Sequence, residues 1–308
     1  MSEGRPPVLP SDVSGQKFVS VYALHAGSLF LPDREVFDDA LDSDTGSKVP
    51  SFAFLIEHDQ HGKLLFDLGL RKHGEGYPPA LKETLQLFTV DCPHDVADIL
   101  QDGGISPNSI NTIIYSHLHF DHVGDLTHFP AAELVIGGPA AEIMEKPYPR
   151  YPDSPWQEFP RHQTVRYIHF DDGVVRFAPS RNVAPLGSFE RGLDFYDDGS
   201  LYLLDAPGHF PGHLAALARV APDTFVLLAA DCCHNRLCYS PGERLISREN
   251  YHDLDVARET VDKVKVMHRL ENVVVILAHE KERLDEMPLF PKALNRWVAA
   301  ETGKKRSR

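Results

Sequence analysis

The sequence predicts an α/β protein with more strands than helices, and three observations support this. Nine apolar runs have the length of strands, and several are β-rich and bounded by Gly, Pro, Asn or Asp. The runs are KFVSVYAL, SFAFLIEH, KLLFDLG, NTIIYSH, AELVIGG, LYLLDAPGH, LAALARV, TFVLLAADC and VVVILAHE. Fewer segments show helical spacing, and no internal period indicates a repeat architecture.

Four segments have the spacing or the boundary residues of helices. PHDVADILQDGG ends in a Gly-Gly pair, and PAAEIMEK is a shorter candidate. Apolar residues recur at helical spacing from Leu254 to Leu270, with Asp253 as the expected N-cap. A last helix is expected from Pro291 to Ala300, and the basic tail GKKRSR that follows is expected to be frayed and solvated.

The chain is expected to form a single domain over residues 1–308, because no Gly/Ser-rich linker divides it. Residues 146–182 interrupt the periodic pattern with YPRYPDSPWQEFPRH, which is rich in Pro and aromatic residues. Long segments without periodicity are uncommon inside compact domains and are often functional. We therefore predict an elaborated loop or lid at 146–182.

Composition and charge exclude several classes of protein. A net charge of -14 argues against binding to nucleic acid, which usually requires a basic surface. The N-terminal segment has no apolar core of a signal peptide, and no apolar run reaches 18 residues, so we expect a cytoplasmic protein with no membrane partner. The four cysteines are too few and too clustered for a disulfide framework and are expected to be reduced.

Side chains that bind metal ions stand at the ends of four apolar runs, namely IIYSHLHFDH, LYLLDAPGH, FVLLAAD and VVVILAH. The seven candidate ligands are His117, His119, Asp121, His122, His209, Asp231 and His279. Because strand ends gather at one rim of a sheet or sandwich, these side chains are expected to lie together. Five imidazoles and two carboxylates suit two Zn²⁺-like ions better than one structural zinc, which closes with four ligands and typically includes Cys.

Isolated histidines have a simpler interpretation. A single His at a strand end, such as His25 or His58, is usually a surface residue or a satisfied core residue. His213, in PGHFPGH, stays open as a further ligand. The four ligand-type residues in the six letters HLHFDH are a different case, because chance does not often produce such a cluster directly after a strand.

The order of these motifs resembles that of the metallo-β-lactamase superfamily. HxHxDH at 117–122 is followed by PGH, by an apolar strand that ends in Asp, and by a strand that ends in His. The resemblance runs from KFVSVYAL to His279 and implies a four-layer αββα sandwich. It implies two divalent metal ions, most simply Zn²⁺, with three protein ligands each and one shared carboxylate. It implies that one ion is held by His117, His119 and His209 and the other by Asp121, His122 and His279. The shared carboxylate is that of Asp231. Asp67, in LLFDLG, matches an early Asp-Gly turn of the family and is read as structural support.

Within the superfamily the sequence is most similar to the N-acyl homoserine lactone lactonases, and also to fungal lactam hydrolases that open benzoxazolinone-type rings. His119 stands where the iron-containing redox branch typically has a carboxylate, which favours hydrolysis. Asp231 stands where some β-lactamases have a cysteine ligand, so Cys232 and Cys233 are expected to be small buried neighbours. The lactonases carry a Tyr three residues after the shared aspartate, and this chain has His234 there. A neutral imidazole can donate one N–H in place of that hydroxyl, and simple packing of His234 is the alternative.

The resemblance implies a dinuclear metal-dependent hydrolase that opens a small cyclic ester or amide, by attack of a metal-bound hydroxide. The substrate would be a small cyclic molecule, such as a lactone or lactam, and the role detoxification. Asp121 and His234 are the candidate catalytic residues, and the substrate pocket is expected to include Tyr148, Trp156 and Phe159. Two alternatives stay open: a glyoxalase II-like thioesterase, and a metal-binding scaffold or sensor without activity.

Overall fold

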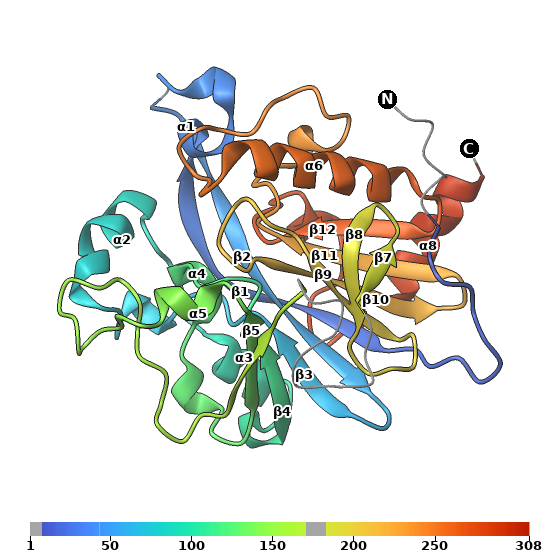
Figure 1. The fold of residues 1–308 in the computed structure, drawn as a ribbon, viewed down its shortest axis with the longest axis horizontal. Coiled ribbons are helices and arrows are strands. Elements are labelled where there is room, and N and C mark those ends of the chain that lie inside the picture. The colour runs from blue at the N-terminus through green and yellow to red at the C-terminus, as the bar shows by residue number, and fades with distance from the viewer. Residues whose placement is uncertain (1–7, 43, 171–182, 308) are drawn as a thin grey trace.

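The computed structural model describes residues 8–42, 44–170 and 183–307, which form two six-stranded sheets (Figure 1). The strands of the first sheet lie side by side in chain order: β1 (Ser20–Pro32), β2 (Gly46–His58), β3 (Gly62–Phe66), β4 (Ile110–Ile114), β5 (Glu133–Gly137) and β6 (Val165–Ile168). The second sheet is built, from one edge to the other, by β12 (Val273–Leu277), β11 (Thr224–Ala230), β10 (Leu214–Ala221), β9 (Leu201–Asp205), β8 (Phe189–Asp194) and β7 (Ala184–Leu186). Each of the nine predicted runs overlaps a strand, and β6, β7 and β8 are additional.

The α-helices of the described residues are α1 (Asp33–Val36), α2 (Lys82–Phe88), α3 (Val96–Asp102), α4 (Phe120–Val123), α5 (Ala140–Ile143), α6 (Leu254–Arg269), α7 (Arg283–Glu286) and α8 (Asn295–Arg306). The prediction for α6 is confirmed, because the Asp253 carboxylate accepts a hydrogen bond from the Val256 backbone N–H at 3.1 Å. Among the described residues, no helix combines the length and the apolar character that crossing a membrane requires.

The last helix differs from the prediction. It begins at Asn295 rather than Pro291 and continues through most of the basic tail to Arg306. The Lys305 ammonium donates hydrogen bonds of 2.6 Å to the carbonyl oxygens of His268 and Val273. These bonds hold the tail against the end of α6, so the expectation of a frayed tail was wrong for the part that the structure describes.

Three apolar clusters separate four layers. Along β11, Phe225 and Leu227 belong to the cluster that also contains α6 residues, whereas Val226 and Leu228 belong to the cluster between the sheets. Both faces of this strand are therefore buried, which explains its continuous apolar sequence. The third cluster packs the outer face of the first sheet against α3. Figure 1 shows α6 along the second sheet and α2 to α5 on the other side of the molecule, which confirms the αββα sandwich.

Strand direction brings the ends of distant segments to one rim. In the first sheet β3 and β4 are parallel, and in the second sheet β11 and β12 are parallel. Strand β9 is two antiparallel steps from β11 and so runs in the same direction. Backbone hydrogen bonds join the two sheets near this rim, from Leu214 N to Ser116 O at 2.8 Å and from Phe52 N to Ala278 O at 3.0 Å.

The segment expected to be a loop or lid is more ordered than predicted. Tyr148 forms a bridge with Gln157, and its backbone pairs with Trp156 O at 2.7 Å and with Glu158 N at 2.8 Å. Residues 165–168 form β6, which pairs in parallel with β5, so this part of the loop prediction was wrong. The rest of the predicted segment, residues 171–182, lies outside the described residues.

Candidate metal centre and adjoining cleft

The seven predicted ligands converge at the rim where β4, β9, β11 and β12 end. Their donor atoms fall into two groups, and within each group the atoms lie within 4.8 Å of one another. The groups are His117, His119, His209 and Asp231, and Asp121, His122 and His279. The HxHxDH motif follows β4, and His119 directly precedes the single-turn helix α4. This change of chain direction brings His117 and Asp121, which are four residues apart, to the same centre.

Asp231 lies between the two groups. Its Oδ2 is 3.3 Å from the Nε2 atoms of both His122 and His279. The same oxygen is 3.6 Å from His209 Nε2 and 3.9 Å from His117 Nε2. One buried carboxylate oxygen therefore faces imidazoles from both groups.

Hydrogen bonds on the outer side fix the tautomers of two of these imidazoles. His209 Nδ1 donates to the Asn250 carbonyl oxygen at 3.0 Å, and His279 Nδ1 donates to the Pro50 carbonyl oxygen at 2.8 Å. A carbonyl oxygen only accepts, so each Nδ1 carries the proton and each Nε2 directs a lone pair toward the centre. This is the arrangement that orients imidazoles which bind metal ions.

Asp67 supports two further imidazoles through Ser116. Its carboxylate accepts hydrogen bonds from Ser116 N at 2.6 Å, from Ser116 Oγ at 2.7 Å and from His122 Nδ1 at 2.9 Å. Because the serine hydroxyl donates to Asp67, it accepts from His117 Nδ1 at 3.0 Å. The Nε2 lone pairs of His117 and His122 therefore also point inward.

The donor atoms are arranged to repel one another unless a cation lies among them. His117 Nε2, His119 Nδ1 and His209 Nε2 are 2.9 to 3.2 Å apart. Within the described part of the chain, buried His122 Nε2 and Asp231 Oδ1 have no hydrogen-bond partner. Converging lone pairs and unpaired buried acceptors are costly in a protein interior, and a divalent ion would satisfy them. The residues therefore fit the metal ions that the sequence implies.

The electrostatics of the two groups differ. Burial lowers the pKa of His119 to about 4 and holds the pKa values of His117 and His209 well below 6.5, so these rings are neutral. Burial opposes protonation of His122 too, but nearby carboxylates, Asp231 foremost, outweigh it and raise the pKa. This part of the centre therefore attracts positive charge, which is a proton on His122 Nε2 or a cation in its place.

His234 lies beside the centre, as its position three residues after Asp231 requires. Its Nε2 is 3.2 Å from Asp231 Oδ2, and its Nδ1 is 3.0 Å from the Tyr251 hydroxyl. The ring stacks on His279 with an interplanar angle of 12°. No pattern in the sequence pointed to Tyr251, which comes from the segment that leads into α6.

His213 and the two cysteines that follow Asp231 do not belong to either group of donor atoms. The Asp231 backbone N–H donates to His213 Nε2 at 3.3 Å, and burial lowers the pKa of this histidine to about 3. His213 therefore supports the backbone of Asp231 as a neutral acceptor. Cys232 and Cys233 are buried, as predicted, and burial raises the pKa of the Cys232 thiol.

A cleft of about 390 Å³ opens onto the centre. His119, Asp121, Asp231, His234 and His279 line its inner end. Its outer walls come from β1, α1, α2 and the 155–156 segment, which are far apart in the sequence. These outer wall residues, among them Glu35 and Phe88, carried no sequence signal.

The three residues predicted to form the substrate pocket occupy different places. Trp156 lines the cleft, with its ring stacked 6.5 Å from that of His119. Phe159 lines a neighbouring cavity instead. Tyr148 is not among the described residues that line either of these two spaces, and its backbone holds the loop that carries Trp156.

Comparison with known proteins assigns the family. The model of the Metallo-beta-lactamase superfamily matches residues 46–279, so the chain belongs to this superfamily. The predicted fold and the enzyme class, a metallo-hydrolase, are thereby confirmed.

Relatives of several kinds are similar to most of this chain. The chain is 32% identical to the metallo-hydrolase mfmC of Annulohypoxylon moriforme, over 92% of this chain and 84% of that protein. It is 30% identical to the gamma-lactamase FDB1 of Fusarium pseudograminearum, over 96% of this chain and 81% of that protein. It is also 33% identical to part of the cytochrome P450 monooxygenase mpaDE of Penicillium roqueforti, covering 83% of this chain but only 32% of that longer protein.

A solved structure supports the fold. The N-acyl homoserine lactone hydrolase whose structure holds N-hexanoyl-L-homoserine at its catalytic metal centre superposes with a TM-score of 0.65. The alignment covers 90% of this chain and 99% of that chain at 20% identity, so it bears on the fold alone.

Proposed function

We propose that this chain is a dinuclear metal-dependent hydrolase that opens a small cyclic ester or amide. The observation that carries the proposal is the convergence of two groups of donor atoms, with Asp231 between them, at the end of a cleft of about 390 Å³. Pockets for small molecules have volumes of this size. A relative named as a gamma-lactamase, 30% identical over 96% of this chain, favours ring opening as the reaction.

The proposed ligands of the two ions are the sets given above, with Asp231 shared and zinc as the expected metal. Such ions supply Lewis acidity toward a carbonyl oxygen and make water nucleophilic near neutral pH. The chain itself provides neutral imidazoles of fixed tautomer. It also provides an aromatic neighbour, Trp156, that excludes water from one side of the cleft.

His234 is proposed to donate an N–H to the carbonyl oxygen of the substrate. The Tyr251 hydroxyl meets Nδ1 at 3.0 Å, and if this hydroxyl donates, the ring proton is on Nε2. Nε2 is the atom that faces Asp231 at the end of the cleft. A donor in this position is worth most where negative charge develops in the transition state.

Asp121 is proposed to hold a proton during the reaction and to pass it to the leaving oxygen or nitrogen. Its side chain lines the cleft and is 10% exposed. One carboxylate oxygen, Oδ2, is 3.4 Å from His279 Nε2, so the group lies at the boundary between the centre and the cleft. That boundary is where a proton has to move from water to the leaving group.

A hydrolysis panel on the metal-loaded protein tests the function. It contains γ-butyrolactone, a long-chain acyl homoserine lactone, benzoxazolinone, a cephalosporin, a glutathione thioester and bis-nitrophenyl phosphate, with products identified by mass. We expect ring opening of a lactone or of the aryl-fused carbamate, consistent with detoxification, and weak or no activity on the cephalosporin and the phosphodiester. Clear preference for the thioester or the phosphodiester would refute ring opening. A cytoplasmic location and the absence of nucleic-acid partners stay predictions.

A further inference from the structure

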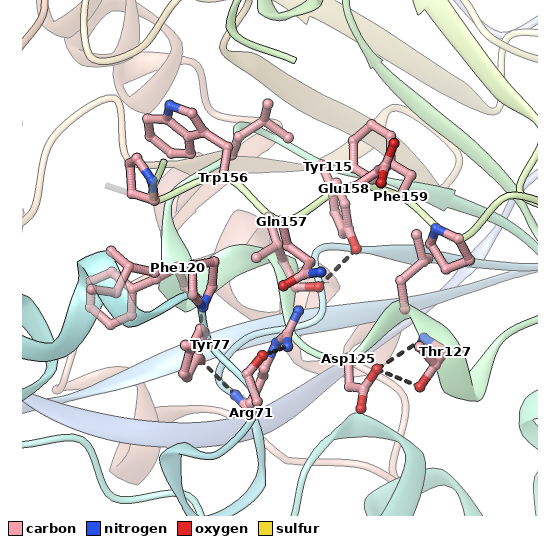
Figure 2. A pocket seen from close by; sticks show the side chains of 18 of the residues that line it. Arg71, Tyr77, Tyr115, Phe120, Asp125, Thr127, Trp156, Gln157, Glu158 and Phe159 are labelled. Carbon is pink, nitrogen blue, oxygen red and sulfur yellow. Dashed lines mark hydrogen bonds between the residues drawn. The ribbon is translucent and has the colours of Figure 1, made fainter. Parts of the chain in front are cut away.

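A second cavity, of about 370 Å³, lies beside the cleft (Figure 2). The two spaces share a wall made of Leu81, Phe120, Pro155 and Trp156. Pockets for small molecules have volumes of this size. The cavity is therefore large enough to hold a small organic group beside the cleft.

Aromatic side chains form much of this cavity. Tyr77, Phe120, Trp156 and Phe159 line it and are labelled in Figure 2. The Phe120 and Tyr77 rings meet edge to face, with centroids 6.1 Å apart. Such walls offer large apolar contact area, and they favour a flat group that can stack or meet their edges.

Arg71 places a positive charge in the same cavity. Its Nε donates to the Gly124 carbonyl oxygen at 2.7 Å and its Nη1 donates to the Gly76 carbonyl oxygen. Within residues 8–42, 44–170 and 183–307, Nη2 makes no hydrogen bond. The guanidinium lies 5.1 Å from the centre of the Tyr77 ring, and Figure 2 shows it among the lining side chains. The two N–H groups of Nη2 are thus available for an oxygen acceptor on a ligand.

The cavity walls are fastened to the helix that carries two candidate metal ligands. The Tyr77 hydroxyl donates to the Phe120 carbonyl oxygen at 3.1 Å, and the Tyr115 hydroxyl donates to the Val123 carbonyl oxygen at 2.7 Å. These carbonyls are the first and last of α4, which also contains Asp121. A group bound in the cavity would therefore be held in a fixed position relative to the metal centre.

We propose that this cavity binds a planar aromatic group that bears an oxygen acceptor and is carried by the cyclic substrate. The link to the substrate rests on the proposed ring-opening function. The wall that the two spaces share allows one substrate to reach from the cleft into the cavity. The aromatic side chains can pack against the flat group, and Arg71 can donate to its oxygen. An alkyl chain would fill the space but would offer neither an acceptor to Arg71 nor a flat face to the aromatic walls, so the aromatic group is the better match.

Binding can be measured without hydrolysis. The chain has two tryptophans, and Trp297→Phe leaves Trp156 as the only one. Its fluorescence reports on both spaces that it lines, and variants of residues that line the cavity alone separate the two. The probe is 4-nitrophenol, which has no bond to hydrolyse, and octanoate is the alkyl rival. We expect saturable quenching by 4-nitrophenol. Affinity should fall about tenfold in Phe159→Ala, which removes a wall, and in Met144→Phe, which narrows the space.

Tyr151→Ala is the matched control, because Tyr151 is an exposed aromatic residue of the same segment that lines neither space. It should leave the affinity unchanged. Quenching that does not saturate, or that both cavity variants leave unaltered, would overturn the proposal. Saturable binding of octanoate alone would overturn the aromatic occupant.

Kinetics test the link to the substrate. The two substrates are α-benzamido-γ-butyrolactone and α-hexanamido-γ-butyrolactone, which share the reacting ring and the amide. Phe159→Ala should reduce kcat/KM for the aryl compound about fivefold more than for the alkyl compound. Equal losses would overturn the assignment of the cavity to the substrate. Saturable 4-nitrophenol binding without hydrolysis of any ring compound would refute the proposed function and leave the aromatic site standing.

Discussion

Replacing Asp67 by Asn should weaken metal binding without touching a metal ligand. The carboxylate accepts from both Ser116 donors and from His122 Nδ1. The amide can keep its oxygen on the Ser116 backbone N–H, and then its NH₂ group faces Ser116 Oγ and His122 Nδ1. His122 must therefore become an acceptor at Nδ1, which moves its proton to Nε2 and removes the inward lone pair. The serine hydroxyl, no longer donating to Asp67, is free to donate to His117 Nδ1, so the same change reaches the other group.

The size of the effect follows from the hydrogen bonds involved. Asp67 is 1% exposed, and its contact with His122 is 2.9 Å long. Hydrogen bonds to charged groups contribute about 1.5 to 3 kcal/mol. In the Asp67→Asn variant, His122 can bind a metal ion only if its proton returns to Nδ1, and it then loses its hydrogen bond to residue 67. The loss of one such bond corresponds to a decrease of about 10- to 100-fold in metal affinity.

The assay is competition for zinc between the purified protein and a chelator of known affinity. Asp95→Asn is the matched control, because Asn caps a helix as well as Asp and this buried residue caps α3, which packs on the outer face of the first sheet. The control should bind zinc like the unaltered protein. Unchanged zinc affinity in Asp67→Asn would refute the argument from tautomers.

Three further predictions concern other residues. Asp231→Ala should reduce metal content in both groups at once, because Asp231 Oδ2 faces both, and full metal content measured by elemental analysis would exclude a shared ligand. His234→Ala should lower kcat more than it raises KM at unchanged metal content, with partial rescue by His234→Tyr, and wild-type kinetics would return His234 to a packing role. Burial, and then the charge of Lys305, lower the pKa of His268 to about 4. The unfolded chain titrates near ~6.5 and therefore binds more protons between these values, so the free energy of unfolding falls as pH drops through this window. Because the ring is partly exposed, we expect the free energy of unfolding to fall by only about 1 to 2 kcal/mol across this window, and His268→Gln should remove this fall. Urea unfolding at both ends of the window measures it, and an unaltered pH dependence in the variant would contradict the prediction.

Most of the sandwich and all seven candidate ligands could be predicted from local sequence. The central strands are buried on both faces, so they appear as continuous apolar runs, as in β11 and β12. The ligands follow directly after such runs, where strand direction carries them to one rim. The grouping of His117 with His209 was predictable only through the resemblance, because the two are 92 positions apart.

What the sequence did not predict depends on contacts between distant segments. Strand β7 is an edge strand of only three residues, and β8 beside it includes charged residues, so neither has an apolar run. The basic tail is helical because Lys305 meets carbonyl oxygens at the end of α6. Tyr251 reaches His234 only through the folding of the segment before α6, and Arg71 enters the second cavity from a loop after β3.

The metal content of the chain tests the central claim most directly. Protein expressed with ample zinc and freed of loosely bound metal should contain two ions per chain by elemental analysis, because each group brings at least three donor residues together and Asp231 faces both. A consistent value of one ion, or of none, would contradict the dinuclear centre on which the proposed function rests.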